Sequence, residues 1–155
     1  MTSALLLPLL AANALAVAFL VLALYRPNPA RLIAGGGFIL AGLVNATLAI
    51  LDPQIYVRGF GPHAVGVYKT AIYGILAPGP TRFILAIAVW QLIVAAMILV
   101  NSTDYTRLGC VCATIFLIGI SPLGLGCAFP SNLILAAALM VLIRLKWPLQ
   151  AHARI

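Results

Sequence analysis

Five apolar segments, separated by short connections, constrain this chain more than any other feature of its sequence. They lie at about residues 4–25, 31–51, 83–100, 107–124 and 131–147. An α-helix rises 1.5 Å per residue, so about twenty apolar residues cross the roughly 30 Å of hydrocarbon in a bilayer. The first two segments reach that length, and the third is slightly short. The pattern predicts an all-α membrane protein, a bundle of five transmembrane helices.

The composition excludes an ordinary soluble domain. Apolar residues make up 65% of the chain and charged residues 7%, whereas a soluble domain carries about a quarter charged residues. The formal net charge of +7 comes from nine Lys and Arg residues against two Asp residues. Because these cations are scattered between apolar segments, they are typical of topology determinants and lipid contacts, and nucleic-acid binding is not expected.

The first apolar segment has to be distinguished from a cleavable signal peptide. It has no basic residue ahead of its apolar core. That core continues for about twenty residues, which is longer than the core of a signal peptide. We therefore expect a retained membrane span, and removal of the segment is the alternative.

The fourth and fifth segments belong to one long apolar region. The stretch SPLGLGCAFPSN interrupts it, and its prolines and glycines, among them Pro122, Gly124 and Pro130, break helices and favour turns. We expect a tight helical hairpin at this point. The whole chain, residues 1–155, then forms a single integral membrane domain.

Basic residues are distributed unevenly over the two sides that five spans define. Counting residues at the segment ends, six of them belong to the first connection (Arg26, Arg31), the third connection (Arg107) and the C-terminal tail (Arg144, Lys146, Arg154), against three in the second connection. Cytoplasmic loops are enriched in Lys and Arg. The distribution therefore predicts an N-terminus outside the cell and a cytoplasmic C-terminus.

The long connection between the second and third segments has a helical pattern of its own. Lys69 and Thr70 fall on one face of it, and the other face is apolar, with Val65, Tyr68, Ile72, Ile75 and Leu76. Fifteen residues, 62–76, are too few to cross the bilayer and return. We expect a short amphipathic outer helix, lying in the interface or folded back over the bundle. A solvated loop is the alternative.

No set of side chains in the sequence predicts catalysis or metal binding. Cys110 and Cys112 point about 200° apart on a helix, and Cys127 lies about 25 Å further along, so none can pair with another. His63 and His152 fall on opposite sides of the predicted topology. The spans also lack the charged residues by which coupled transporters move ions. We therefore predict neither a catalytic site nor a metal site, and three free thiols.

Three uncharged amides fall at similar depth in the outer half of the predicted bundle. Counted from the outer helix ends, Asn13 lies about 13 Å deep, Asn45 about 9 Å and Gln91 about 12 Å. An unpaired amide that faces lipid is costly, so these side chains should face inward. They either join helices together or form the polar spot of an apolar pocket that receives a quinone carbonyl or a lipid headgroup.

Three aromatic residues would line the mouth of such a pocket. Tyr56, Phe60 and Tyr68 lie in the connection that contains the predicted outer helix. In this hypothesis the outer helix covers the pocket.

A glycine-rich stretch in the second span, AGGGFILAG, predicts close helix packing. Gly37 and Ala41 are small residues four positions apart, a spacing that lets a neighbouring helix approach. A ligand groove along the same face is the alternative.

Part of the chain resembles the DoxX-like group of small bacterial membrane proteins. The resemblance runs from about residue 31 to residue 144 and rests on ARLIAGGGFILAGLVNA, DPQIYVRGFG and IFLIGISPLGLGCAFPSNLILAAAL. It implies a four-helix core in the bacterial inner membrane, here preceded by an extra N-terminal span. Some members of that family are linked to quinone or thiol redox systems, but this chain lacks a paired-thiol motif.

The leading expectation for function is a non-catalytic accessory or interaction subunit of a membrane protein assembly, because the chain is short and lacks catalytic sets. Its partners would be membrane lipids and other membrane subunits, or further copies of itself. A quinone- or lipid-binding subunit of a redox system is the alternative, and a small uncoupled carrier is a third hypothesis. No cofactor is predicted, apart from a quinone under the alternative.

Overall fold

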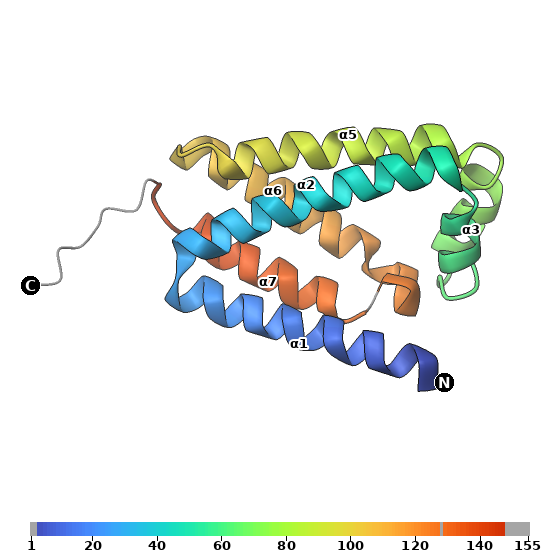
Figure 1. The fold of residues 1–155 in the computed structure, drawn as a ribbon, viewed down its shortest axis with the longest axis horizontal. Coiled ribbons are helices and arrows are strands. Elements are labelled where there is room, and N and C mark those ends of the chain that lie inside the picture. Colours follow the sequence, from blue (N-terminus) through green and yellow to red (C-terminus); the bar gives the residue numbers. More distant parts are fainter. Residues whose placement is uncertain (1–2, 128, 148–155) are drawn as a thin grey trace, which may run out of the picture.

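The computed structural model describes residues 3–127 and 129–147, and this part of the chain is all-helical, without a strand (Figure 1). Its long helices are α1 (Ser3–Tyr25), α2 (Pro27–Leu51), α5 (Pro80–Leu99), α6 (Thr103–Ile120) and α7 (Ser131–Ile143). Its short elements are α3 (Ile55–Phe60), α4 (Val67–Ala71), the π-helical turn η1 (Ile72–Leu76) and the 3₁₀ segment η2 (Ser121–Cys127).

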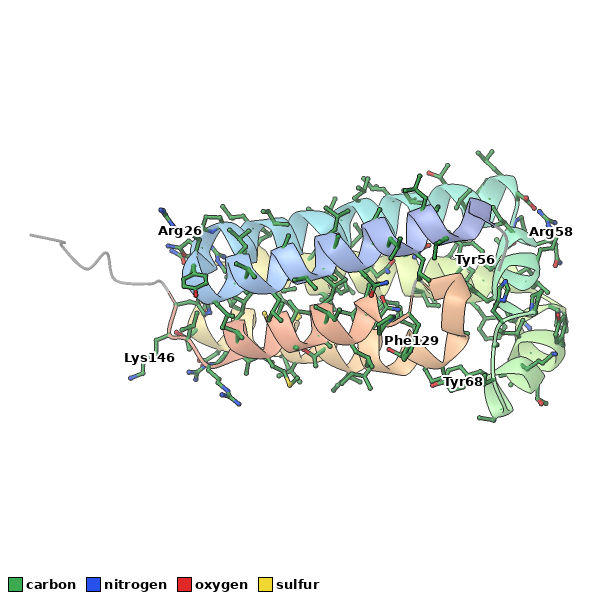
Figure 2. All side chains as sticks on the ribbon, turned by 90° about the horizontal axis from the view of Figure 1, so that it is seen from below. Arg26, Tyr56, Arg58, Tyr68, Phe129 and Lys146 are labelled. Atoms are coloured by element: carbon green, nitrogen blue, oxygen red, sulfur yellow. The ribbon has the colours of Figure 1, made fainter. Side chains whose placement is uncertain are left out.

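The long helices run antiparallel in chain order, so the bundle has two ends (Figure 1). One end carries the α1–α2 junction, the α5–α6 junction and the end of α7, and we call it the Arg26 end. The other carries the start of α1 together with α3, α4, η1 and η2, and we call it the α3 end. Figure 2 shows Arg26 and Lys146 at the first of these ends and Tyr56 and Arg58 at the second.

Four helices in the described part of the chain are long and apolar enough to cross a membrane: Leu6–Tyr25, Pro27–Leu51, Pro80–Leu99 and Thr103–Gly124. This agrees with the prediction of an integral membrane protein. The α7 helix is shorter than the predicted segment 131–147, because its 13 residues rise only about 20 Å. It ends where the backbone N–H of Arg144 bonds the carbonyl of Val141, which tightens the last turn.

The outer segment differs from the predicted helix over residues 62–76. Helix α3 precedes it, residues 61–66 form a turn, and Gly66 has a φ of +53°, which favours glycine. The π-helical turn then bonds the N–H of Ala77 to the carbonyl of Ile72, five residues earlier. A π turn shifts the helical phase by one residue. Ile72 is buried, whereas Val65 and Ile75 are exposed.

The turn at residues 61–66 packs on η2 and closes the α3 end. The N–H of Val65 donates to the carbonyl of Pro122 at 3.3 Å. Gly124 has a φ of +69°, and a Cβ at this position would lie 2.7 Å from the His63 carbonyl oxygen. The helix is therefore interrupted between the fourth and fifth apolar segments, as predicted. The interrupting residues also pack against the outer segment.

Glycines let α5 approach both of its neighbours in the bundle. A Cβ at Gly35 would lie 2.5 Å from Leu99 Cγ, and one at Gly42 would lie 3.1 Å from the Ala88 carbonyl oxygen. Gly109 of α6 is equally close, since a Cβ there would lie 2.9 Å from the Ile98 backbone nitrogen. Close packing in the AGGGFILAG stretch thus comes from positions seven residues apart. The predicted pair of Gly37 and Ala41 does not make it.

At the Arg26 end of the bundle, two arginine side chains cap the C-termini of neighbouring helices. Arg31 is 8% exposed, and its Nη1 donates to the carbonyls of Ile98 at 3.0 Å and Leu99 at 2.8 Å. Arg107 Nε donates to the carbonyl of Ile143 at the end of α7, at 3.0 Å. The last carbonyls of a helix lack partners within the helix and carry partial negative charge. Each guanidinium therefore satisfies these groups and is itself stabilised.

Candidate ligand-binding cavity

A cavity of about 520 Å³ lies inside the bundle, and all five long helices contribute to its wall. The wall is apolar except for Gln91 of α5 and Ser131 of α7. A volume of this size, with few polar groups in an apolar lining, is typical of a site for one small molecule.

The cavity is elongated parallel to the helices. It extends from Ala12 to Phe19 along α1, from Ile33 to Ala41 along α2 and from Ser131 to Leu139 along α7, which corresponds to about 12 Å on each helix. Ser131 is the first residue of α7 and lies toward the α3 end, whereas Leu139 lies toward the Arg26 end. The cavity therefore becomes wholly apolar toward the Arg26 end.

The cavity opens sideways, between α1 and α2. Figure 1 shows these two helices joined at the Arg26 end and diverging toward the α3 end. Leu15 of α1 and Ile33 of α2 both line the cavity and are 71% and 55% exposed. Gly37 lies beside them, and a Cβ there would meet no atom within 4 Å.

A chain of three polar side chains joins the cavity to the α3 end. The Tyr56 hydroxyl of α3 donates to Asn45 Oδ1 of α2 at 2.7 Å, and Asn45 Nδ2 donates to Gln91 Oε1 at 2.7 Å. Gln91 is 4% exposed and lines the cavity. No acceptor among the described residues takes a hydrogen bond from its Nε2. The chain therefore ends in an unused donor at the cavity wall.

Burial of Tyr56 favours the protonated form of its side chain. Its ring is buried at the α3 end and packs on Phe60, with ring centroids 5.8 Å apart. Burial raises the pKa of the Tyr56 hydroxyl above its ordinary value of 10.0. At neutral pH the hydroxyl thus keeps its proton and can donate to Asn45.

The predicted site residues are only partly brought together. Asn45, Gln91 and Tyr56 form the chain described above. Asn13 stays apart from it: its Nδ2 bonds the Leu9 carbonyl of its own helix at 2.8 Å, and its Oδ1 is buried without a partner in the described part of the chain. Its neighbour Ala12 lines the cavity, so Asn13 flanks the wall.

The aromatic residues that were expected at the mouth lie elsewhere. Tyr56, Phe60 and Tyr68 are all at the α3 end, and none of them lines the cavity. The mouth faces sideways instead of lying under the outer segment. A role of these three residues and of Asn13, Asn45 and Gln91 in ligand binding stays a prediction.

Two small residues line the cavity and support the alternative that we gave for the glycine-rich stretch. Gly37 and Ala41 face the cavity, where they leave space that larger side chains would fill. A pattern of small residues in one helix indicates space on that face, and only the neighbouring helix decides whether the space is filled by packing or left as a groove.

The cysteines show no arrangement for redox or metal chemistry in the described part of the chain. Cys110 is a buried free thiol and Cys112 a half-buried one, and the side chain of Cys127 lies outside the described residues. Within these limits no three His, Cys, Asp or Glu side chains come close enough to hold a metal ion.

Comparison of the chain with protein-family models, with curated proteins and with solved structures gave no match. The resemblance to the DoxX-like group therefore stays a hypothesis.

Proposed function

We propose that this protein is a non-catalytic integral membrane protein that holds one long-chain molecule of the bilayer, a lipid or a quinone, inside its helix bundle. The observation that carries the proposal is the 520 Å³ cavity, which is apolar over most of its length and opens between α1 and α2. An apolar molecule dissolved in the membrane could enter through this opening without passing through water. Of the functions considered from the sequence, a lipid- or quinone-binding subunit fits this geometry best.

The proposal includes a topology of five crossings. In this arrangement α7 completes the fifth crossing together with η2 and residues 144–147, because α7 alone is short. Five described cations lie at the Arg26 end, namely Arg26, Arg31, Arg107, Arg144 and Lys146, against three at the α3 end, namely Arg58, Lys69 and Arg82. The excess favours a cytoplasmic Arg26 end. The mouth of the cavity then lies within the hydrocarbon layer.

An accessory role in a larger assembly is a separate hypothesis, and it does not compete with ligand binding. A subunit that holds a lipid or a quinone could present it to a partner in the same membrane. Binding of a ligand in the cavity requires neither such a partner nor redox chemistry by this chain.

Substitution of neighbouring glycines tests whether the cavity is a binding site. Gly37→Leu places a side chain at the mouth, whereas Gly36→Leu places the same side chain on the outer surface of α2. Both positions are exposed, and a Cβ at either meets no atom within 4 Å. Both changes also remove a helical glycine, which favours the helix by about 0.5–1 kcal/mol. We therefore expect both variants to fold.

The measurement is native mass spectrometry of the protein after gentle solubilisation from its membrane. We expect the original chain and the Gly36→Leu variant to retain a long-chain molecule, and the Gly37→Leu variant to retain at least tenfold less. Equal retention by the two variants would contradict the proposal. So would an original chain that carries no such molecule above the level of bulk lipid.

A further inference from the structure

We infer that Gln91 binds a carbonyl oxygen of the molecule in the cavity, and that Asn45 and Tyr56 position the Gln91 amide to donate to it. This inference rests on the proposed function and specifies the chemistry of the occupant. The occupant would be a single long apolar chain with a carbonyl group at its head, as in a quinone or an acyl ester. The head would point toward the α3 end and the chain toward the Arg26 end or out of the mouth.

The direction of the hydrogen bonds in this chain determines which group of Gln91 remains available to a ligand. Tyr56 donates to the amide oxygen of Asn45, which turns the amide nitrogen of Asn45 toward Gln91. That nitrogen donates a hydrogen bond to the amide oxygen of Gln91. The remaining group of Gln91 is an NH₂, which can only donate. A ligand carbonyl is an acceptor that matches it, whereas a saturated hydrocarbon leaves it unpaired.

The surroundings of Gln91 increase the contribution that a hydrogen bond from its amide to a ligand carbonyl makes to the binding free energy. Gln91 is 4% exposed, and its Nε2 is not among the fully buried unpaired atoms, so this donor borders the space of the cavity. A buried donor without an acceptor costs more than a paired one gains, because its desolvation is not compensated. Around Gln91 the wall is apolar, and Ser131, the other polar lining residue, already makes an interaction of its own. An acceptor supplied by the occupant therefore contributes both affinity and orientation.

The position of Gln91 within the cavity sets the orientation of the occupant. Gln91 and Ser131 provide the polar part of the wall, while Phe19, Ile33 and Leu139 form the part toward the Arg26 end, which has no polar group. A molecule with one polar head places it where a donor is available. Its apolar chain then fills the rest of the cavity, whose whole length is about 12 Å along the helices, and a longer chain extends out of the mouth.

The competing explanation is that Asn45 and Gln91 only join α2 to α5. Hydrogen-bonded amides between membrane helices commonly have this role. The two explanations differ in what they predict for ligands. A purely joining pair changes the stability of the bundle and has no preference among apolar ligands. A donor to the ligand discriminates between molecules with and without a carbonyl.

The test compares three apolar-chain probes that differ in their headgroups. We would titrate the purified protein with decyl-benzoquinone, with methyl laurate and with decylbenzene, and count bound molecules by native mass spectrometry. Decylbenzene has the chain and the ring of the quinone but no carbonyl. We expect at least one carbonyl probe to bind about tenfold more tightly than decylbenzene, as for one buried hydrogen bond. Preference for the quinone or for the ester identifies the source of the carbonyl.

Substitution of Gln91 assigns that preference to this residue. In the Gln91→Leu variant we expect the affinity for the carbonyl probe to fall about tenfold, and the affinity for decylbenzene to stay unchanged. Equal binding of the quinone, the ester and decylbenzene to the original chain would overturn the inference, and so would a Gln91→Leu variant that weakens all probes equally. Failure of all three probes to bind would overturn the proposed cavity function as well.

The positioning role of Tyr56 has a spectroscopic readout. The infrared carbonyl stretch of the bound probe should shift to lower frequency in the original chain, because a hydrogen bond weakens the C=O bond. We expect Tyr56→Phe to reduce this shift, since Asn45 and Gln91 lose the group that orients them. Tyr68→Phe, at the same end of the bundle but outside the hydrogen-bond chain, should leave the shift unchanged. An unshifted carbonyl in the original chain, or equal effects of the two variants, would contradict the inference.

Discussion

At the scale of single residues, Arg31 shows how a cation can be part of the interior of a membrane bundle. It has no acidic partner among the described residues, and its charge is balanced by the carbonyls at the end of α5. Its guanidinium also lies over the ring of Trp147, 5.1 Å from the ring centre, in a cation–π contact. The indole N–H of Trp147 bonds the Leu142 carbonyl at 3.4 Å. One arginine thus connects the ends of α2, α5 and α7.

Removal of this side chain should destabilise the bundle. We expect Arg31→Met to lower the free energy of unfolding by about 2–3 kcal/mol, because hydrogen bonds to a charged group contribute about 1.5–3 kcal/mol. The control is Arg26→Met at the same end, where the exposed side chain should contribute less than about 0.5 kcal/mol. Equilibrium unfolding in detergent, followed by circular dichroism, measures both. Equal losses in the two variants would contradict this role of Arg31.

The sequence predicted the amide contact between Asn45 and Gln91 in part, but it did not predict the role of Arg31. Depth along a helix can be counted, so residues at similar depth can be proposed as neighbours. In the count of loop charges, Arg31 was assigned to the first connection. Pro27 and Pro29 are suited to a helix start, and they place Arg31 inside the second helix. This signal could have identified it as a residue that folds back over a neighbouring helix end.

At the scale of elements, the contact between α5 and α6 depends on Gly109. A Cβ at this position would lie 2.9 Å from backbone and side-chain atoms of Ile98 and Met97. The backbone cannot move aside as a flexible side chain can. The two helices therefore have to separate if Gly109 is replaced by a larger residue.

A pair of alanine substitutions in α6 tests this contact. We expect Gly109→Ala to lower the free energy of unfolding by about 1–3 kcal/mol, as overpacking of a close contact does. Gly119→Ala in the same helix should instead raise it by about 0.5–1 kcal/mol, because a Cβ there meets no atom within 4 Å and alanine favours the helix. Unfolding in detergent measures both. A stabilising effect of Gly109→Ala would contradict the close approach.

Helix lengths were predictable from the sequence where apolar runs are long, and less so where the backbone departs from the α-helix. The apolar runs predicted α1, α2, α5 and α6 to within a few residues. The predicted outer helix was wrong at its start, since Gly66 adopts a positive φ. The π turn at residues 72–76 changes the helical phase, so Ile75 is exposed while Ile72 is buried. A helical period read from the sequence assumes a constant number of residues per turn, which this segment does not have.

At the scale of the whole molecule, the five-crossing topology can be tested by labelling. Thr70 and Asn28 are exposed residues at opposite ends of the bundle, so we would place single cysteines there in a chain without its own cysteines. We expect an impermeant maleimide added to intact cells to label Thr70→Cys at once. Asn28→Cys should react only after the membrane is permeabilised. Labelling of both sites in intact cells would contradict the topology.

The cavity could not be predicted from the sequence, although several of its wall residues were singled out. It arises because α1 and α2 diverge from their junction while α6 and α7 pack behind them (Figure 1). The angle between two helices depends on side chains distributed over the whole bundle. A periodic pattern in one segment therefore indicates which face is small, as at Gly37, but does not locate the space in front of it.

Under the proposed function, a mouth that faces hydrocarbon would determine which quantity governs loading of the cavity. An occupant that exchanges with the acyl-chain layer responds to its mole fraction in the bilayer, whereas its concentration in the surrounding water has little influence. Diluting the occupant with inert lipid at a constant total amount would then empty the protein. The lipid composition of its host membrane would therefore act as the ligand concentration for this protein.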